Sequence, residues 1–190
     1  MSAQPVPPIT PEEYLELDRQ ADYRSEYFDG QVYAMSGGSH DHSIIIGNLV
    51  GELRTALRGT GCITSPIDTR LLVSPTGLYT YPDVVVVCDS TQYTDDRRDT
   101  LINPTVIFEV LSPSTELHDR VFKFNQYRKI ESLREYILVA QDEPHAETYR
   151  RQGDQWLLTV FDGIDTVCDI ESIRCRLALS EIYYQVQFRT

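Results

Sequence analysis

Two acidic residues lie beside or within apolar runs that a folded chain would bury. Asp83 directly precedes four valines at 84–87, and Glu109 lies within the run Val-Ile-Phe-Glu-Val-Leu at 106–111. An acid in such a position is costly to bury unless something pairs with it. Hard divalent cations bind carboxylate oxygens, so Asp83 and Glu109 on neighbouring strands would share one Mg²⁺ or Mn²⁺ ion. Phosphodiester hydrolysis is a reaction that such an ion supports, because it polarises the phosphoryl oxygen and lowers the pKa of a bound water.

Two further acids add to this pattern, whereas the lysine that usually accompanies it is missing. Glu26 lies just before a predicted hairpin, and Asp68 lies on a predicted strand. A Pro-Asp followed one strand later by a glutamate is typical of the nuclease pattern PD…(D/E)xK. Strand period places residue 111 on the same face as Glu109, and there the pattern has a lysine that stabilises charge. Residue 111 is leucine in this chain, so the strict motif fails at that position.

The motif residues belong to longer stretches with a family resemblance. YPDVVVVCD and NPTVIFEVLSPSTELHDRVFKFNQYRKIESLREYILV resemble the Uma family of "putative restriction endonucleases", within the PD-(D/E)xK superfamily. SEYFDGQVYAMSGGSHDH and IIIGNLVGELRTALRG are similar to the N-terminal part of that family. The resemblance implies a restriction-endonuclease-like core, a DNA substrate, Asp83 and Glu109 as metal ligands, and Glu26 as an additional acid. It also implies that the lysine of DRVFK, Lys123, replaces the one missing at Leu111.

Each primary candidate also has a purely structural explanation. Asp83 can cap a turn after proline, Glu109 can pair with an arginine, and Glu26 can be a surface acid. Lys123 can pair in solvent with Asp119, four residues earlier on a helix, which contributes only about 0.2–0.5 kcal/mol.

The secondary candidates are more ambiguous. Asp68 and Arg70 are two residues apart on one strand face, which favours pairing with each other or with neighbours over a role in catalysis. Ser112 begins a Ser-Pro-Ser-Thr segment that either contacts phosphate at a helix start or simply caps that helix. His40 and His42, near another helix start, are either ligands or ordinary loop residues.

The rest of the sequence predicts an α/β fold with a mixed central sheet and flanking helices. Apolar residues three and four apart predict helices over 42–58 and 116–130, the second burying Val121, Phe124, Tyr127 and Ile130. Runs rich in β-branched residues or with alternating polarity predict strands. The predicted strands cover 67–73, 83–88, 105–111 and 135–139. We expect them to lie in one sheet, with the two helices packed on it.

The two ends of the chain predict smaller elements. Thr10-Pro11-Glu12-Glu13 is typical of a helix start. Asp29-Gly30 and Gly153-Asp154 each predict a hairpin turn, the second giving an added hairpin after the nuclease-like core. A short helix is expected within 177–186. We predict a flexible arm at 1–9 and one restriction-endonuclease-like domain over 10–190.

Composition excludes several classes of protein. There is no run of about 18 apolar residues and no basic, apolar leader, so neither a membrane segment nor a signal peptide is expected. Cys62, Cys88, Cys168 and Cys175 form no CxxC pair, which predicts a disulfide-free, cytoplasmic chain. The net charge of −12 opposes non-specific attraction to DNA, so any nucleic-acid contact has to be local.

Two functions remain open from the sequence. The first is a Mg²⁺- or Mn²⁺-dependent DNA endonuclease that uses Glu26, Asp83, Glu109 and Lys123. By analogy we expect a homodimer, because cutting both DNA strands is simplest with two sites. The second is a non-catalytic module on the same fold that binds DNA or protein and has decayed at residue 111. Titration with Mn²⁺ separates them, because a decayed site should not bind the ion.

Overall fold

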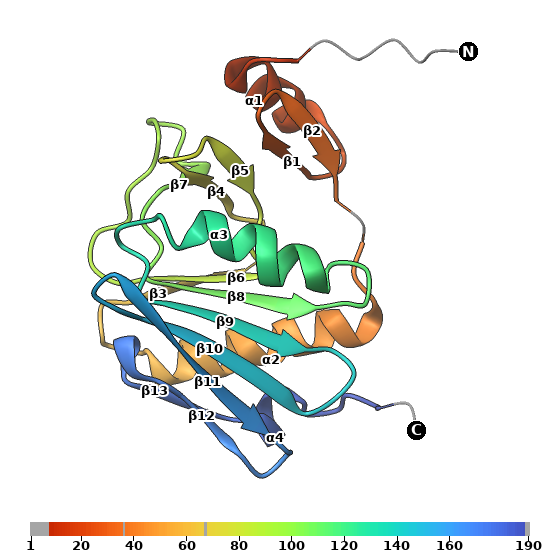
Figure 1. Cartoon of the computed structure of the whole chain (residues 1–190), viewed down its shortest axis with the longest axis vertical. Coiled ribbons are helices and arrows are strands. Elements are labelled where there is room, and N and C mark those ends of the chain that lie inside the picture. Colours follow the sequence, from red (N-terminus) through yellow and green to blue (C-terminus); the bar gives the residue numbers. More distant parts are fainter. Residues whose placement is uncertain (1–7, 36, 67, 189–190) are drawn as a thin grey trace.

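The computed structural model describes residues 8–35, 37–66 and 68–188. Its centre is a six-stranded mixed sheet in the order β11-β10-β9-β8-β6-β3 (Figure 1). Neighbours β8 and β9 are parallel, and the other pairs are antiparallel. The strands are β3 (Ile63–Pro66), β6 (Val84–Val87), β8 (Val106–Leu111), β9 (Glu135–Ala140), β10 (His145–Gln152) and β11 (Gln155–Asp162).

Two smaller sheets complete the strands. A five-stranded sheet in the order β2-β1-β5-β4-β7 joins the N-terminal part to the centre. Its members are β1 (Ser25–Phe28), β2 (Gln31–Ala34), β4 (Arg70–Val73), β5 (Leu78–Thr80) and β7 (Thr100–Leu101). The third sheet is a hairpin of β12 (Val167–Ile170) and β13 (Cys175–Ala178).

Helices cover both faces of the central sheet (Figure 1). One face packs on α2 (His40–Ala56) and α4 (Leu179–Ile182), next to β12, β13 and the short 3-10 turn Glu171–Ile173. The other face packs under the π-helical segment η1 (His118–Lys123) and α3 (Phe124–Tyr127), whereas α1 (Pro11–Gln20) belongs to the N-terminal part. Alternate valines of β6 enter the two apolar cores, which explains why the run is apolar throughout.

The expected α/β fold with a mixed, helix-flanked sheet is confirmed, but the strand predicted over 67–73 is shorter and lies in a different sheet. The chain turns after Pro66, where Thr69 N–H donates to the Pro66 carbonyl, and β4 starts only at Arg70. β4 lies in the five-stranded sheet, and β3 is the strand that pairs with β6. The alternating polarity over 67–73 could not reveal this turn. Such a pattern predicts an extended chain but does not predict which strand it pairs with.

The helix predicted over 116–130 also differs. Its middle is the π-helical segment η1, in which Phe124 N–H donates to the Asp119 carbonyl five residues earlier. This wider turn changes which side chains face the sheet. Val121, predicted to be buried, is 51% exposed, whereas Asp119 and Lys123 are buried.

Other local predictions are confirmed. Thr10 and Glu13 form a capping box at the start of α1. The helix predicted over 42–58 is α2, which begins two residues earlier, at His40, after the cap Ser39. Both hairpins form, as β1–β2 and β10–β11. Most of the predicted arm, residues 1–7, lies outside the described residues, and Ile9 N–H donates to the Gly30 carbonyl.

The expectation of a disulfide-free chain is wrong. Cys62 and Cys88 form a disulfide between the ends of β3 and β6. The strand register pairs Ile63 with Val87. Cys62 precedes Ile63 and Cys88 follows Val87, so the same register places the two cysteines opposite each other. Sequence spacing missed this pair because sheet register, rather than proximity along the chain, brings the thiols together. Among the residues described, no helix has the length and apolar character needed to cross a membrane.

Candidate active site

Asp83 and Glu109 face each other across neighbouring antiparallel strands. β6 and β8 pair Val84 with Phe108, and the next step of that register places Asp83 opposite Glu109. Both side chains therefore lie on the sheet face beneath η1 and α3. Asp83 Oδ2 accepts a hydrogen bond of 2.7 Å from Val110 N–H. The two acids are 6% and 2% exposed, so two carboxylates are buried on one face.

Lys123, on the η1 segment that covers this sheet face, lies next to the buried Glu109. Its Nζ lies 3.0 Å from Glu109 Oε1, 3.0 Å from Asp119 Oδ1 and 3.6 Å from Glu26 Oε1. The residue is only 7% exposed, so its pairing with Asp119 is not the solvent contact that the sequence allowed. Leu111 packs instead into the apolar core on that face. The η1 segment thus supplies a cation that β8 itself lacks.

Glu26 enters from the five-stranded sheet. Thr80 Oγ1 donates to Glu26 Oε1, and His118 Nε2 lies 3.4 Å from Glu26 Oε2. Burial alone would raise the pKa of Glu26, but the His118 hydrogen bond and the Lys123 charge outweigh it and lower this pKa to about 2. Glu26 is therefore a carboxylate at neutral pH. We call Glu26, Asp83, Glu109 and Asp119 the acid cluster.

The charges of the cluster are coupled through Glu109 and Lys123. Burial raises the pKa of Glu109 well above its usual value, and the opposing Lys123 charge does not cancel this effect. Burial would lower the pKa of Lys123, but Glu109, Asp119 and Glu26 together raise it. The ammonium therefore keeps its proton, and Glu109 holds a proton more tightly than an exposed acid does. Tyr127 also donates to Glu109 Oε1, at 2.9 Å.

A cavity of about 290 Å³ opens beside these groups. Asp83, Glu109, Asp119 and Lys123 line it, and the loop before α2 and the segment after β8 form its rim. Ser112 is part of this rim and shares hydrogen bonds with the hydroxyls of Ser114 and Thr115. The cavity gives a small ligand access to buried acids.

Sequence reasoning missed or undervalued three residues here. His42 Nε2 lies 3.3 Å from Asp83 Oδ2, and this contact raises the pKa of His42 against the lowering effect of burial. Asp119 had been considered only as a surface partner, although its spacing of four from Lys123 already placed both on one helix face. His118 contacts Glu26 and stacks on Phe122, and nothing in the sequence singled it out.

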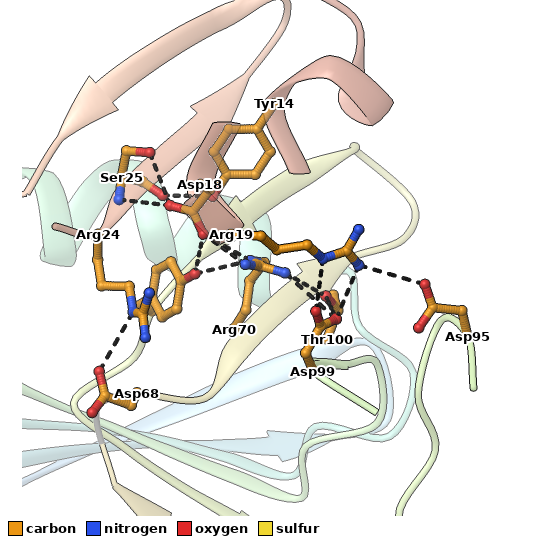
Figure 2. A network of polar contacts seen from close by, with 11 residues as sticks. Tyr14, Asp18, Arg19, Arg24, Ser25, Asp68, Arg70, Asp95, Asp99 and Thr100 are labelled. Atoms are coloured by element: carbon orange, nitrogen blue, oxygen red, sulfur yellow. Dashed lines mark hydrogen bonds and ion pairs between the residues drawn. The ribbon is translucent and has the colours of Figure 1, made fainter. Parts of the chain in front are cut away.

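Two predicted secondary residues lie outside the site. Asp68 has an exposed side chain and pairs with Arg24 at 3.5 Å. Arg70 is buried against Asp18 at 2.6 Å and also donates to Tyr81 and Thr100 (Figure 2). We call Asp18, Arg70, Tyr81 and Thr100 the arginine network. Its contacts explain Arg70 as a structural residue that joins α1 to the second sheet.

The donor set of the acid cluster fits a divalent cation, although the ligands are not prearranged around one point. Across the described ranges, no three His, Cys, Asp or Glu side chains are grouped closely enough to hold an ion as they lie. Yet three buried acids contact one lysine, Asp83 lies opposite one of them, and Asp119 Oδ1 has no hydrogen-bond donor among the residues described. Carboxylate oxygens of this kind are the ligands that Mg²⁺ and Mn²⁺ prefer. Lys123 and Tyr127 both donate to Glu109 Oε1 and neither donates to Oε2.

A helix-flanked mixed sheet with buried acids facing a cavity is the arrangement of restriction-endonuclease-like proteins. The profile of the Uma2 family, described as "Putative restriction endonuclease", matches residues 11–179. The chain belongs to this family.

Two relatives and one solved structure are also similar to this chain. Two uncharacterized proteins of Synechocystis sp. are 36% and 35% identical to this chain over 187 and 156 residues. The alignments cover 97% and 82% of this chain, and 96% and 88% of the relatives. The crystal structure of a "putative nuclease belonging to DUF820" from Anabaena variabilis superposes with a TM-score of 0.78 at 21% identity. That match covers 95% of this chain and 100% of the other, and it shows the shared fold.

Proposed function

We propose that this protein is a Mg²⁺- or Mn²⁺-dependent DNA endonuclease that hydrolyses phosphodiester bonds in the cavity beside the acid cluster. The observation that carries the proposal is the placement of Asp83 opposite Glu109, on one sheet face, with Lys123 Nζ 3.0 Å from Glu109. This arrangement supplies both carboxylates and the cation of the PD…(D/E)xK pattern, despite leucine at position 111. Membership of the Uma2 family supports the same reaction class.

Each residue has a distinct proposed role. Asp83 and Glu109 would hold the cation, and Glu26 would support the site as an ionised neighbour of Lys123. The bound cation supplies charge stabilisation at the phosphoryl group and a more acidic water. Lys123 remains protonated next to three acids, so its ammonium can stabilise negative charge that builds on the scissile phosphate.

The rim of the cavity suits a phosphate group. The 17-residue helix α2 begins there with Ser39 as its cap, and the start of a helix carries partial positive charge. Ser112, Ser114 and Thr115 add hydroxyl groups. These features matter because the net charge of −12 repels DNA elsewhere on the surface.

The assembly and the cellular location form further parts of the proposal. A homodimer would bring one site to each strand of a duplex, which is the simplest way to cut both. An enzyme that acts on DNA inside the cell would work in the cytoplasm, and this location is part of the proposal.

Plasmid cleavage tests the proposal. Wild type should convert supercoiled plasmid to nicked or linear DNA with Mg²⁺ or Mn²⁺, and excess EDTA should stop the reaction. Asp83→Ala should lower the rate by at least about a hundredfold, since it removes a proposed metal ligand. Asp68→Ala is the matched control, because Asp68 is an exposed acid outside the site. Equal cleavage by wild type and Asp83→Ala would refute the proposal.

One observation favours a second candidate function, a non-catalytic module that binds DNA or protein. Leu111 occupies the usual lysine position, and no three ligands among the described residues are prearranged for an ion. Calorimetric titration with Mn²⁺ separates the two candidates. The endonuclease should bind the ion, whereas the module should show no heat of binding and no cleavage.

A further inference from the structure

Asp119 has an unusual environment for a buried acid. The residue is 3% exposed, and its Oδ1 accepts no hydrogen bond from any residue that the structure describes. Lys123 Nζ lies 3.0 Å from this oxygen and forms an ion pair with it. Most buried polar atoms in proteins have a hydrogen-bond partner. A buried oxygen with no donor beyond this ion pair, on a residue that lines the cavity, is a candidate ligand for a second cation.

The backbone holds Asp119 in this environment. Phe124 N–H and Tyr136 Oη both donate to the Asp119 carbonyl, the second at 3.0 Å. The π-helical turn of η1 places Asp119 and Lys123 on the buried side and leaves Val121 exposed. Single π-turns within helices are rare and often occur at functional sites. The local fold thus keeps a charged side chain inside when a regular helix could expose it.

The charge balance leaves room for a further cation. Asp83, Glu109 and Asp119 line the cavity together with a single lysine, Lys123. The nearby Arg120 pairs with Glu116 and Glu147 instead. Lys123 and His42, which also lines the cavity and lies 3.3 Å from Asp83, together offset at most two of these three acids. A divalent ion would offset the third, at a cost in desolvation that carboxylate ligands reduce.

We propose that Asp119 is a third carboxylate ligand of the divalent-cation site, together with Asp83 and Glu109. This inference rests on the proposed function of the cavity as a cation site. It assigns Asp119 a role that is distinct from orienting Lys123. In the ligand role, Asp119 contributes to cation affinity directly, whether or not a lysine is present at position 123.

Calorimetric titration with Mn²⁺ tests this role without relying on cleavage. Asp119→Asn keeps the shape of the side chain and removes its charge, and it should weaken Mn²⁺ binding at least about tenfold. Asp83→Asn is the reference for a lost ligand. Glu116→Gln is the matched control, because it removes one charge from an exposed acid nearby that pairs with Arg120. This control should bind Mn²⁺ as wild type does.

A lysine-free background separates the two roles of Asp119. If Asp119 is a ligand, Asp119→Asn should weaken Mn²⁺ binding by a similar factor in wild type and in Lys123→Met. An effect that disappears in Lys123→Met would show that Asp119 acts through Lys123, and it would overturn the proposal. Melting curves without Mn²⁺ establish that each variant is folded, and Asp119→Ser replaces Asp119→Asn if the latter does not fold.

The possible failures are distinguishable. Unchanged Mn²⁺ affinity in Asp119→Asn, with lost affinity in Asp83→Asn, would remove Asp119 from the ligand set and leave the proposed endonuclease intact. Absence of Mn²⁺ binding by wild type would refute the cation site, and with it both the proposed function and the role of Asp119.

Discussion

The acid cluster and the arginine network are both buried and charged, but they are built differently. In the arginine network, Asp18 Oδ1 accepts from Ser25, and Asp18 Oδ2 accepts from Arg70 and Tyr81 (Figure 2). Burial would raise the pKa of Asp18, but these hydrogen bonds and the Arg70 charge lower it. In the acid cluster, acids outnumber cations, the pKa of Glu109 is raised by burial, and Asp119 Oδ1 lacks a donor.

This difference distinguishes buried charged residues that stabilise the fold from those that are available to bind a ligand. A balanced, fully hydrogen-bonded network holds α1 on the second sheet and has no unused capacity for a ligand. An unbalanced cluster beside a cavity is costly for folding, and perturbed acids of this kind gather at functional sites. Burial alone would have ranked Asp18 with Glu109. Hydrogen-bond satisfaction and charge balance distinguish them.

The largest stability effect should come from the arginine network. Arg70→Ala leaves Asp18 buried without its cation, which should lower the free energy of unfolding by about 3–5 kcal/mol. Urea denaturation measures the change. Arg24→Ala is the matched control, because Arg24 pairs with the exposed Asp68 and should cost at most about 1 kcal/mol. A loss below about 1 kcal/mol in Arg70→Ala would contradict the structural role of this network.

A smaller loss should follow from neutralising Glu26. Its pKa falls from 4.5 to about 2 on folding, so the ionised form adds about 3 kcal/mol of stability at neutral pH. Glu26→Gln should lose this contribution above about pH 4.5. The difference from wild type should vanish as the pH falls through the folded pKa of about 2. Urea denaturation from pH 7 down to pH 3 tests this trend, and a pH-independent difference would show that packing rather than charge is responsible.

Neutralising Glu109 should have the opposite effect on the free energy of unfolding. Because burial raises its pKa, the unfolded chain gains stability by ionising this acid at neutral pH. Glu109→Gln should therefore raise the free energy of unfolding, and with it the melting temperature, at neutral pH. The gain should disappear below the ordinary carboxyl pKa, where Glu109 is protonated in both states. A lower melting temperature at pH 7 would mean that the Lys123 pair outweighs burial.

Much of the fold could be predicted from local sequence. The valine run and the acid-bearing run had to be buried strands, and the caps and Asp-Gly turns marked helix starts and hairpins. The turn at Pro66 and the second sheet could not be predicted, because strand partners depend on contacts distant in sequence. The Cys62–Cys88 disulfide depends on the same register.

The candidate site was predictable only in part. The apolar runs singled out Asp83 and Glu109, and the family resemblance pointed to Lys123. The environment of Asp119 depends on a π-helical turn, which no sequence pattern predicted. The contacts of His42 and His118 required the three-dimensional approach of α2, β1 and η1 to one place.

Cleavage by Lys123→Ala tests most directly whether Lys123 and the acid cluster form one hydrolytic site. Single-turnover cleavage of plasmid in Mn²⁺ is measured for wild type, Lys123→Ala and Lys129→Ala, the last being the only other lysine in the chain. Loss of the ammonium beside Glu109 should lower the rate by about 10²–10³-fold, while Mn²⁺ still binds and Lys129→Ala cleaves as wild type does. An unchanged cleavage rate in folded Lys123→Ala would contradict the account.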